Sequence, residues 1–489
     1  MSARDVVIVG GGPAGLAAAA RLASAGLAVT LVDEQPELGG QYYRRPSPAT
    51  LRAHGDHRPA GGRLIRLVRR LGVECLTGHL VWGVADDART LLVSGRPGSA
   101  VRLRARHVII ATGAYERTHP FPGWQLPGVT TPGFAQHLAA ADGTAIGERV
   151  LVAGSGPFLL PVACSLLDLG VHVVGVAEAG RPYRPSGRAL TSLRHPARLR
   201  ELAAYTARLA AARVPLWQDR VVVRADGAGR VSSVTLAAGA DPAVPLRTLD
   251  VDALCVGYGF RPQADLARLL GCAVRTDPVS GDAVPVTDRY GLSSRPDVYI
   301  AGEAAGIGGV HLAETRGLTA AAHILARRDR ASGPARREVL HLAARRRRLA
   351  SFTALSESLY PAPGDLADLL APALPGDTTV CRCEAVTAAD VRATARLASG
   401  DLNATKARTR AGMGPCQGRF CGFAVAALAR HATGAVPPGA AGGTASDEAR
   451  ECGAHPPTGG PVFPSRQPIR PVPVESLLAL GADDDGEDA

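Results

Sequence analysis

The stretch "DVVIVGGGPAGLAAAARLASAGLAVTLVDE" near the N-terminus constrains the fold more than any other part of the chain. An apolar run ends in Gly10, and Gly12 and Gly15 follow with the spacing G-x-G-x-x-G ahead of an alanine-rich segment. In a strand–turn–helix unit the first glycine permits a sharp turn, the second lets a diphosphate approach the backbone, and the third lets the helix pack closely. Asp33 ends the next apolar run, where a carboxylate can accept hydrogen bonds from ribose hydroxyls. The stretch therefore predicts an α/β fold that binds a dinucleotide.

A second stretch, "RVLVAGSGPFLLPVACSLLDLGVHVVGVAEAG" (149–180), repeats the order of strand, turn and helix with one difference. Gly154 and Gly156 keep the first two glycine positions, but Leu159 occupies the third, where its bulk should hold the helix away from the strand. Glu178 follows at the end of the next apolar run and could meet a ribose. We expect a second nucleotide-binding-like domain, and the sequence leaves open whether it binds NAD(P), another nucleotide or nothing.

Four cysteines near the C-terminal end form two pairs. "CRCEAVTAADV" supplies Cys381 and Cys383, and "GPCQGRFCG" supplies Cys416 and Cys421. Four thiolates are enough for one metal centre, and the segment between the pairs predicts a helix, a turn and a second helix that bring them together. Structural zinc is the main alternative to an iron–sulfur cluster, but it usually uses C-x2-C knuckles, a spacing that neither pair has.

Residues beside these cysteines suit a sulfur-bound centre. Gly414, Gly418 and Gly422 leave backbone N–H groups free to point at sulfur, and Arg382 and Arg419 could offset negative charge. No cysteine pair accompanies the first glycine motif, so we expect no redox-active dithiol there.

Two more stretches carry a resemblance to a known group. "HVIIATGAYERTHPFPG" (107–123) and "RPDVYIAGEAAGIGG" (295–309) resemble the second and third FAD signatures of the two-dinucleotide-binding-domain flavoproteins, the glutathione-reductase-like group, and "LGGQYYR" (38–44) resembles their flavin-side loop. The resemblance implies FAD at the first site, with Glu303 replacing the aspartate that usually bonds a ribityl hydroxyl. The residues that it assigns to FAD are Gly10, Gly12, Pro13, Ala14, Gly15, Asp33, Glu34, Gly39, Gly40, Gln41, Val81, Thr112, Gly113, Gly302 and Glu303.

The cysteine module resembles the bacterioferritin-associated-ferredoxin-like [2Fe-2S] domain, although many members of that group end in C-x2-C where this chain has C-x4-C. That resemblance makes Cys381, Cys383, Cys416 and Cys421 the cluster ligands. Together with the late segment "RQPIRPVPVESLLAL" (466–480), the chain from about residue 5 to about residue 480 resembles the FAD/[2Fe-2S] α subunits of heteromeric amine and amino-acid dehydrogenases.

This second resemblance implies an oxidoreductase subunit that carries electrons. A substrate-oxidising flavoprotein β subunit would attack a C–N bond of an amino acid, imino acid or opine, such as proline or hydroxyproline. The alternative is a stand-alone NAD(P)H-dependent FAD oxidoreductase that reduces its own cluster, and a third class is a non-enzymatic protein with structural zinc. No carboxylate or histidine pair stands out, so the sequence assigns no acid–base catalyst.

The same reasoning divides the chain into domains. The FAD-binding domain is expected in two parts, with the second nucleotide-binding-like domain inserted between them and a glutathione-reductase-like arrangement overall. The expected boundaries are 1–145 and 251–328 for the FAD-binding domain, 146–250 for the inserted domain, 329–375 for a basic linker helix, 376–433 for the small helical [2Fe-2S] domain, and 434–489 for a flexible Pro/Gly-rich tail with an acidic end.

Composition limits the partners and the compartment. The net charge of +11 comes almost entirely from arginine, with Lys406 the single lysine, and no aromatic residues alternate with the basic ones, so we expect no nucleic acid. Nine cysteines form no disulfide framework, and a strand-like run begins at Asp5, which favours the cytoplasm. Polar residues interrupt the stretch 150–177, so no transmembrane segment is expected. A peripheral membrane site or a respiratory-chain acceptor stays open, as do the substrate, the stoichiometry and the order of electron flow.

Overall fold

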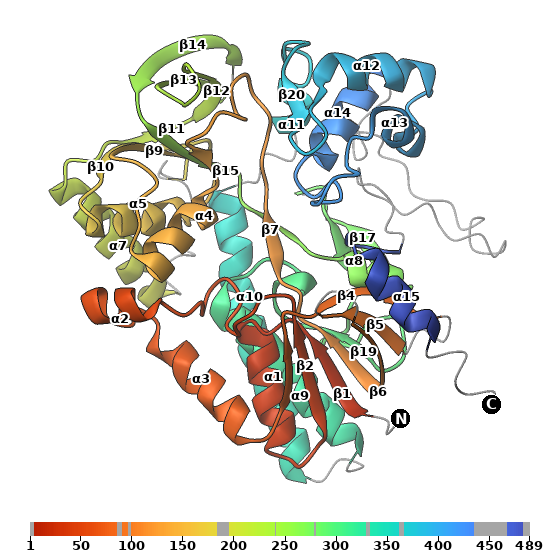
Figure 1. Ribbon diagram of the computed structural model, residues 1–489. Coiled ribbons are helices and arrows are strands. Elements are labelled where there is room, and N and C mark those ends of the chain that lie inside the picture. The colour runs from red at the N-terminus through yellow and green to blue at the C-terminus, as the bar shows by residue number, and fades with distance from the viewer. Residues whose placement is uncertain are drawn as a thin grey trace.

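The computed structural model describes residues 4–85, 90–95, 99–182, 195–239, 241–277, 280–328, 333–360, 366–434 and 467–482. Two bodies built on parallel sheets lie one above the other, and a small helical unit lies beside the upper one (Figure 1). This arrangement confirms the predicted α/β class with an additional small helical domain.

The lower body contains the strand that precedes the first glycine motif. Its sheet has the order β3-β2-β1-β6-β5-β4, and β19 pairs with β6. Strands β1, β2, β3, β6 and β19 are parallel, while β4, β5 and β6 form an antiparallel meander. The bounds are β1 Arg4–Val9, β2 Val29–Asp33, β3 Glu74–Thr77, β4 Leu80–Val84, β5 Thr90–Ser94, β6 Ala100–Ile110 and β19 Val298–Ile300.

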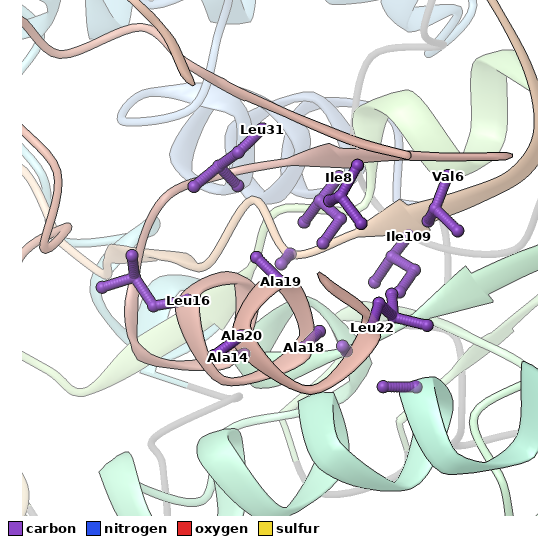
Figure 2. Packing of buried hydrophobic residues seen from close by; sticks show 14 of the residues in the cluster. Val6, Ile8, Ala14, Leu16, Ala18, Ala19, Ala20, Leu22, Leu31 and Ile109 are labelled. Carbon is purple, nitrogen blue, oxygen red and sulfur yellow. The ribbon is translucent and has the colours of Figure 1, made fainter. Parts of the chain in front are cut away.

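Helices cover this sheet closely because their contact residues are small. Helix α1 (Pro13–Ala23) packs on α9 (Val310–Arg328) and on α3 (Pro59–Arg70), and α9 packs on α10 (Gly333–Leu359). A Cβ atom at Gly317 of α9 would lie 2.1 Å from the carbonyl oxygen of Ala14, so glycine is required there. Figure 2 shows Ala19 and Leu22 of α1 on the side of the helix that faces Ile8 and Ile109 of the strands.

The upper body is a second parallel sheet, with the order β11-β10-β9-β15-β8. It holds the second glycine motif between β9 and α5, and a three-stranded antiparallel sheet, β12-β13-β14, lies beside it. The bounds are β8 Val129–Thr130, α4 Pro132–His137, the π-helix η1 Leu138–Asp142, β9 Arg149–Gly154, α5 Leu159–Asp168, β10 His172–Glu178, α7 Pro196–Ala211, β11 Leu216–Gln218, β12 Arg220–Asp226, β13 Ser233–Ala238, β14 Asp241–Asp250 and β15 Ala253–Gly257.

The chain passes between the two bodies along a pair of antiparallel strands, β7 (Ala114–Glu116) and β16 (Phe260–Pro262). Strand β7 follows β6 on the way to the upper body, and β16 follows β15 on the way back. The remaining elements of this part are α2 Pro48–His54, α8 Asp265–Leu269, β17 Val274–Thr276, β18 Ala283–Pro285 and the 3-10 helix η2 Gly302–Ala305.

The small unit surrounds the four paired cysteines. Between the pairs, the predicted helix, turn and helix are α12 (Ala388–Leu397) and α13 (Leu402–Thr409). A capping box of Thr387 and Asp390 begins α12, and Val391 packs against the apolar side of α14. The other bounds are α11 Leu366–Leu370, β20 Thr379–Cys381, β21 Val386–Thr387, α14 Gly422–Thr433 and α15 Val474–Ala482.

The predicted linker helix corresponds to α10, in which Arg346 donates hydrogen bonds to the carbonyls of Asp288 and Arg289 while Arg345, Arg347 and Arg348 are exposed. Within the part of the chain that the structure describes, no helix combines the length and the apolar character needed to cross a membrane. Of the predicted tail, residues 435–466 and 483–489, including the acidic end, lie outside the described residues. The predicted domain boundaries stay predictions.

Candidate functional site

The first glycine turn has the geometry of a dinucleotide cradle. A Cβ atom at Gly10 (φ +108°) would lie 2.3 Å from the carbonyl oxygen of Ala111, and one at Gly15 would lie 1.9 Å from that of Gly10. At Gly12 the nearest atom would be the Cα of Gly40, at 3.9 Å, so the backbone is open to an approaching group. Helix α1 begins directly after Gly12, and no side chain caps it. Its first N–H groups are therefore placed for an anion such as a diphosphate.

Asp33 supports this turn from the end of β2. One carboxylate oxygen accepts a hydrogen bond of 2.6 Å from the N–H of Gly11, and the other accepts one of 2.7 Å from Gln35. Burial raises the pKa of Asp33 above its usual range. The neighbouring Glu34 is more exposed and forms an ion pair of 3.0 Å with Arg470. Asp33, the residue predicted to bond a ribose hydroxyl, therefore also holds the loop in shape.

The predicted flavin-side loop lies directly on the glycine turn. The N–H of Gly39 donates to the carbonyl of Gly11 (2.9 Å), and a Cβ atom at Gly40 would come within 2.8 Å of the Cα of Gly12. Gln41, the next residue, is exposed toward the cavity described below. Both glycines have positive φ angles, so the loop requires them at these positions.

The two other predicted FAD signatures lie around the same cavity as the first glycine turn. The hydroxyl of Thr112 donates to the carbonyl of Gln263 (3.0 Å), and Gly113 adopts a φ of +80°. Gly302 begins η2, where the carboxylate of Glu303 accepts an N–H bond of 3.1 Å from Gly309. Burial is the largest influence on Glu303 and raises its pKa. The longer glutamate thus turns back onto its own loop.

These features line one cavity of about 1300 Å³. Except for Gly15 and Gly39, every residue that the resemblance assigned to FAD lines it, Val81 included. The chain contains eight phenylalanines, nine tyrosines and three tryptophans, and ten of these twenty aromatic residues line the cavity in the described part. A pocket of this size and aromatic character fits a flavin dinucleotide.

Sequence reasoning missed several residues of this cavity. Tyr115, Phe420, Ile469 and Arg470 line it, and the last three come from the cysteine turn and the C-terminal segment. The segment 466–480, which contains Ile469 and Arg470, was the available signal, but spacing alone could not place it at the first site.

The second glycine turn is arranged differently from the first. Glu178 accepts the N–H of Gly156 (3.0 Å) and that of Gly180 (2.9 Å), which leaves the N–H of the second glycine already bonded. Helix α5 begins only at Leu159, the third residue after Gly156, whereas α1 begins directly after Gly12. The side chain of Leu159 is buried.

The large cavity described above also reaches this second turn, where Gly156, Pro157 and Phe158 line it. A cavity of about 10 Å³ lies among Leu159, Glu178, Trp217 and Tyr360, which is at most the space of one water molecule. A Cβ atom at Gly175 would lie 2.3 Å from the ring of Trp217, so the indole packs directly on β10. The indole therefore fills the side of β10 beside Glu178.

The four paired cysteines gather at one end of the small unit. Cys381 ends β20 and Cys421 precedes α14, and both are buried, while Cys383 is exposed and Cys416 is half-buried. The Sγ atoms of Cys383 and Cys416 are 4.0 Å apart. The Cys421 thiol lies within hydrogen-bonding reach of Cys381 and of Cys416, where it is the largest influence and lowers their pKa values to about 6 and about 5.

Backbone amides also point at these sulfurs. The N–H groups of Gly412 and Glu384 reach Cys381, and those of Gly418 and Phe420 reach Cys416. Gly418 was predicted in this role, and the other three donors were not. Among the described residues, no group of three or more histidine, cysteine or acidic side chains is arranged tightly enough for a single metal ion. Four cysteine thiols with N–H donors are the donor set of an iron–sulfur cluster.

A C-x4-C spacing allows the turn because Gly414 permits close approach. A Cβ atom there would lie 2.2 Å from the Cβ of Cys383, so the two cysteine pairs could not meet with any other residue. Of the two predicted charge-balancing arginines, Arg419 donates to the carbonyl of Cys416 (3.1 Å), while the guanidinium of Arg382 stacks over the ring of Trp124 at 3.9 Å. Arg382 therefore links the cysteine unit to the upper body.

Two arginines outside the cysteine unit contact it through Phe423 on α14. The guanidinium groups of Arg117 and Arg261 lie 4.9 Å and 4.2 Å from the ring of Phe423. Arg117 pairs with Asp282 at 2.5 Å. Arg261 also donates to the carbonyl of Arg419. These contacts hold the cysteine turn beside the cavity, since Phe420 reaches its wall.

Known proteins resemble the whole of this arrangement. Residues 4–323 match the family model "Pyridine nucleotide-disulphide oxidoreductase", and residues 379–431 match "BFD-like [2Fe-2S] binding domain". The chain is 36% identical to hydrogen cyanide synthase subunit HcnB of Pseudomonas aeruginosa and 35% identical to an opine oxidase subunit of Rhizobium meliloti; each alignment covers 88% of this chain and 93% of the relative. The crystal structure of L-proline dehydrogenase from P. horikoshii matches with a TM-score of 0.62 at 21% identity, over 96% of this chain and 78% of that one, which supports the fold.

Proposed function

The chain belongs to the pyridine nucleotide-disulphide oxidoreductase family and carries a BFD-like [2Fe-2S] domain, and from this membership we propose a specific role in the oxidation of carbon–nitrogen bonds. It is an FAD-dependent oxidoreductase with a [2Fe-2S] centre and the electron-transfer α subunit of a heteromeric dehydrogenase. The partner in this proposal is a flavoprotein β subunit that binds an amino acid, imino acid or opine of the proline or hydroxyproline type. The names of the relatives support it, since they are subunits of an opine oxidase and a hydrogen cyanide synthase.

The residues divide the work between two sites. The N-terminus of α1 and the turn at Gly12 would hold the FAD diphosphate, Asp33 would take a ribose hydroxyl, and the paired cysteines would hold the cluster. Bound FAD exchanges two electrons with a partner and the cluster exchanges one at a time. The aromatic side chains of the wall would cover part of the bound FAD, and the contacts of the cysteine turn keep the two sites adjacent.

One observation carries the choice between the two candidate functions. A stand-alone reductase needs a site for NAD(P)H, and at the second glycine turn the N–H of Gly156, which a diphosphate would approach, is already bonded to Glu178. The electrons therefore enter from a partner protein in this proposal, and the inserted domain keeps the fold of a nucleotide domain without that ligand.

Co-purification tests this proposal. The tagged full-length chain is isolated anaerobically from its native host, and its visible spectrum, iron content and bound proteins are recorded. We expect flavin and iron–sulfur absorption, two irons per chain and a second flavoprotein. Addition of proline, hydroxyproline or an opine should bleach the flavin of the complex and leave the isolated chain unchanged. Prompt bleaching of the isolated chain by NADH or NADPH would contradict the proposal.

A further inference from the structure

Residues 467–470, which we call the strap, return to the lower body after the cysteine unit and run along the cavity. The N–H of Ile469 donates to the carbonyl of Trp82 on β4 (2.9 Å), and the side-chain oxygen of Gln467 accepts the N–H of Val84 (3.0 Å). The side chain of Ile469 is buried in the core beneath β4, β5 and β6. The strap is therefore anchored by backbone pairing and by burial.

Arg470 extends from the strap to two residues beside the FAD site, one after Asp33 and one after the turn at Thr112. Its guanidinium pairs with Glu34 at 3.0 Å and donates to the hydroxyl of Tyr115. Glu34 follows Asp33, and Tyr115 follows the predicted nucleotide turn at Thr112. A planar guanidinium suits this position because it can bond a carboxylate and a phenol at once while it lies against an aromatic ring.

Arg419 reaches the strap from the cysteine turn. It lies between Cys416 and Cys421 in the sequence, and its side chain is 7% exposed. It donates to the carbonyls of Cys416 (3.1 Å) and Ile469 (3.2 Å) and pairs with Asp265 at 2.7 Å. One buried guanidinium thus joins the cysteine turn, the strap and the lower body.

The ring of Tyr115 lies close to the guanidinium groups of both arginines. The guanidinium of Arg419 lies 5.3 Å from its ring centre, and that of Arg470 lies 5.6 Å away. Two like charges are tolerated together because Asp265 and Glu34 each compensate one of them. Burial raises the pKa of Tyr115 to about 12, so the phenol keeps its proton.

We propose that Arg419 and Arg470 are positioning residues, which hold the cysteine turn at a fixed distance from the FAD site through the strap. In this proposal one chain of contacts between the two sites runs from Cys416 through Arg419 to Tyr115. Electron transfer between two centres falls steeply as their separation grows, so a loosened turn slows it without removing either cofactor. This last consequence rests on the proposed function, whereas the mechanical coupling does not.

Hydrogen exchange of the full-length loaded protein tests the coupling. In the Arg470→Met variant, loss of a charge-assisted hydrogen bond should make the amides of residues 416–421 exchange about tenfold faster. Arg21→Met is the matched control, because it removes a partly buried ion pair with Glu338 far from the cysteine turn. Unchanged exchange of residues 416–421 in Arg470→Met overturns the proposal.

A second variant covers the case in which Arg470→Met does not retain FAD. Asp265→Asn, at a residue that does not line the cavity, removes the ion pair of Arg419 and leaves Arg470 in place, so exchange in residues 416–421 should rise again. If neither variant shifts this exchange, the strap does not hold the turn.

Photoreduction of the flavin, followed by spectroscopic observation of the cluster, tests the consequence for electron transfer. Arg470→Met should keep its FAD, its iron and the electron paramagnetic resonance spectrum of the reduced cluster, but equilibrate the electron several times more slowly; Arg470→Lys should recover part of the rate. An unchanged rate in fully loaded Arg470→Met overturns the positioning role. If the exchange shift is present but no electron passes even in the unmodified chain, the proposed function fails and the mechanical coupling stands.

Discussion

Glu178 and Gly156 are joined by a hydrogen bond of 3.0 Å that closes the second glycine turn from inside the protein. At the first turn the shorter Asp33 bonds Gly11 and leaves Gly12 open. The extra methylene of glutamate therefore moves the bond one residue along the turn, to the glycine that a diphosphate would otherwise approach.

Glu178→Ala should lower the free energy of unfolding of the chain by about 2 kcal/mol, because it leaves the N–H groups of Gly156 and Gly180 without their partner. FAD content should not change. Thermal melts with parallel flavin measurement check this, and Glu201→Ala, which removes an exposed i,i+3 pair with Arg198, is the control. An equal effect of both variants would mean that Glu178 does not support the turn.

Gly12→Ala and Gly15→Ala should fail in different ways. A methyl group at Gly12 meets no protein atom closer than 3.9 Å, so the variant should fold normally but bind FAD at least about tenfold more weakly, since the methyl group occupies the approach of the diphosphate. At Gly15 it would collide with the carbonyl of Gly10, so the apoprotein itself should be destabilised. Apoprotein melting and fluorescence titration with FAD separate the two effects. Equal FAD affinity in Gly12→Ala would contradict the cradle.

Replacement of one paired cysteine should remove the cluster and leave the flavin. Cys416→Ser is expected to lose most of its iron and its iron–sulfur absorption while it retains FAD, because the two sites use separate residues. Cys75→Ser, at a half-buried cysteine outside the pairs, is the control. Stoichiometric zinc and no iron in the anaerobically prepared, unmodified chain would instead support a structural zinc site.

His119 should make the free energy of unfolding depend on pH below about pH 6.5. Burial, the larger cause, and the nearby Arg117 lower its pKa from about 6.5 to about 3, and neither ring nitrogen has a hydrogen-bond partner in the described structure. The folded state therefore binds fewer protons than the unfolded state between these values. Stability is complete above about pH 6.5 and falls as the pH decreases toward 3.

His119→Phe should reduce this slope, because phenylalanine keeps the edge-on contact with Tyr258, whose ring centre lies 5.0 Å away, and cannot be protonated. Melting temperatures of the two proteins between pH 7 and pH 5 provide the measurement. Parallel curves would mean that other groups cause the acid loss.

The sequence predicted those parts of the site whose chemistry is local. A glycine turn between a strand and a helix can be recognised in the sequence because close backbone contacts within the same sheet and turn require glycine at positions 10 and 15. The paired cysteines were predictable for the same reason, and the helices between them were found where expected. The acid of each turn was identified, but not its bond, because one methylene decides which N–H group it reaches.

The contacts between distant segments were not predictable. Arg382 was expected to balance charge near the cysteines. Its guanidinium stacks on Trp124, which lies more than two hundred residues earlier in the sequence. The position of the strap depends on a backbone bond to Trp82 and on the burial of Ile469, neither of which leaves a periodic pattern in the sequence. Such contacts follow from the packing of whole domains.

The three tryptophans lie at three different junctions of the molecule. Trp82 bonds the strap, Trp124 carries the guanidinium of Arg382 and Trp217 fills the second glycine turn. Since the chain has no other tryptophan, a variant that keeps one indole gives a fluorescence signal for one junction alone. Variants that keep one tryptophan at a time would therefore report the order in which the strap, the cysteine unit and the inserted domain come apart during unfolding, with no dye attached.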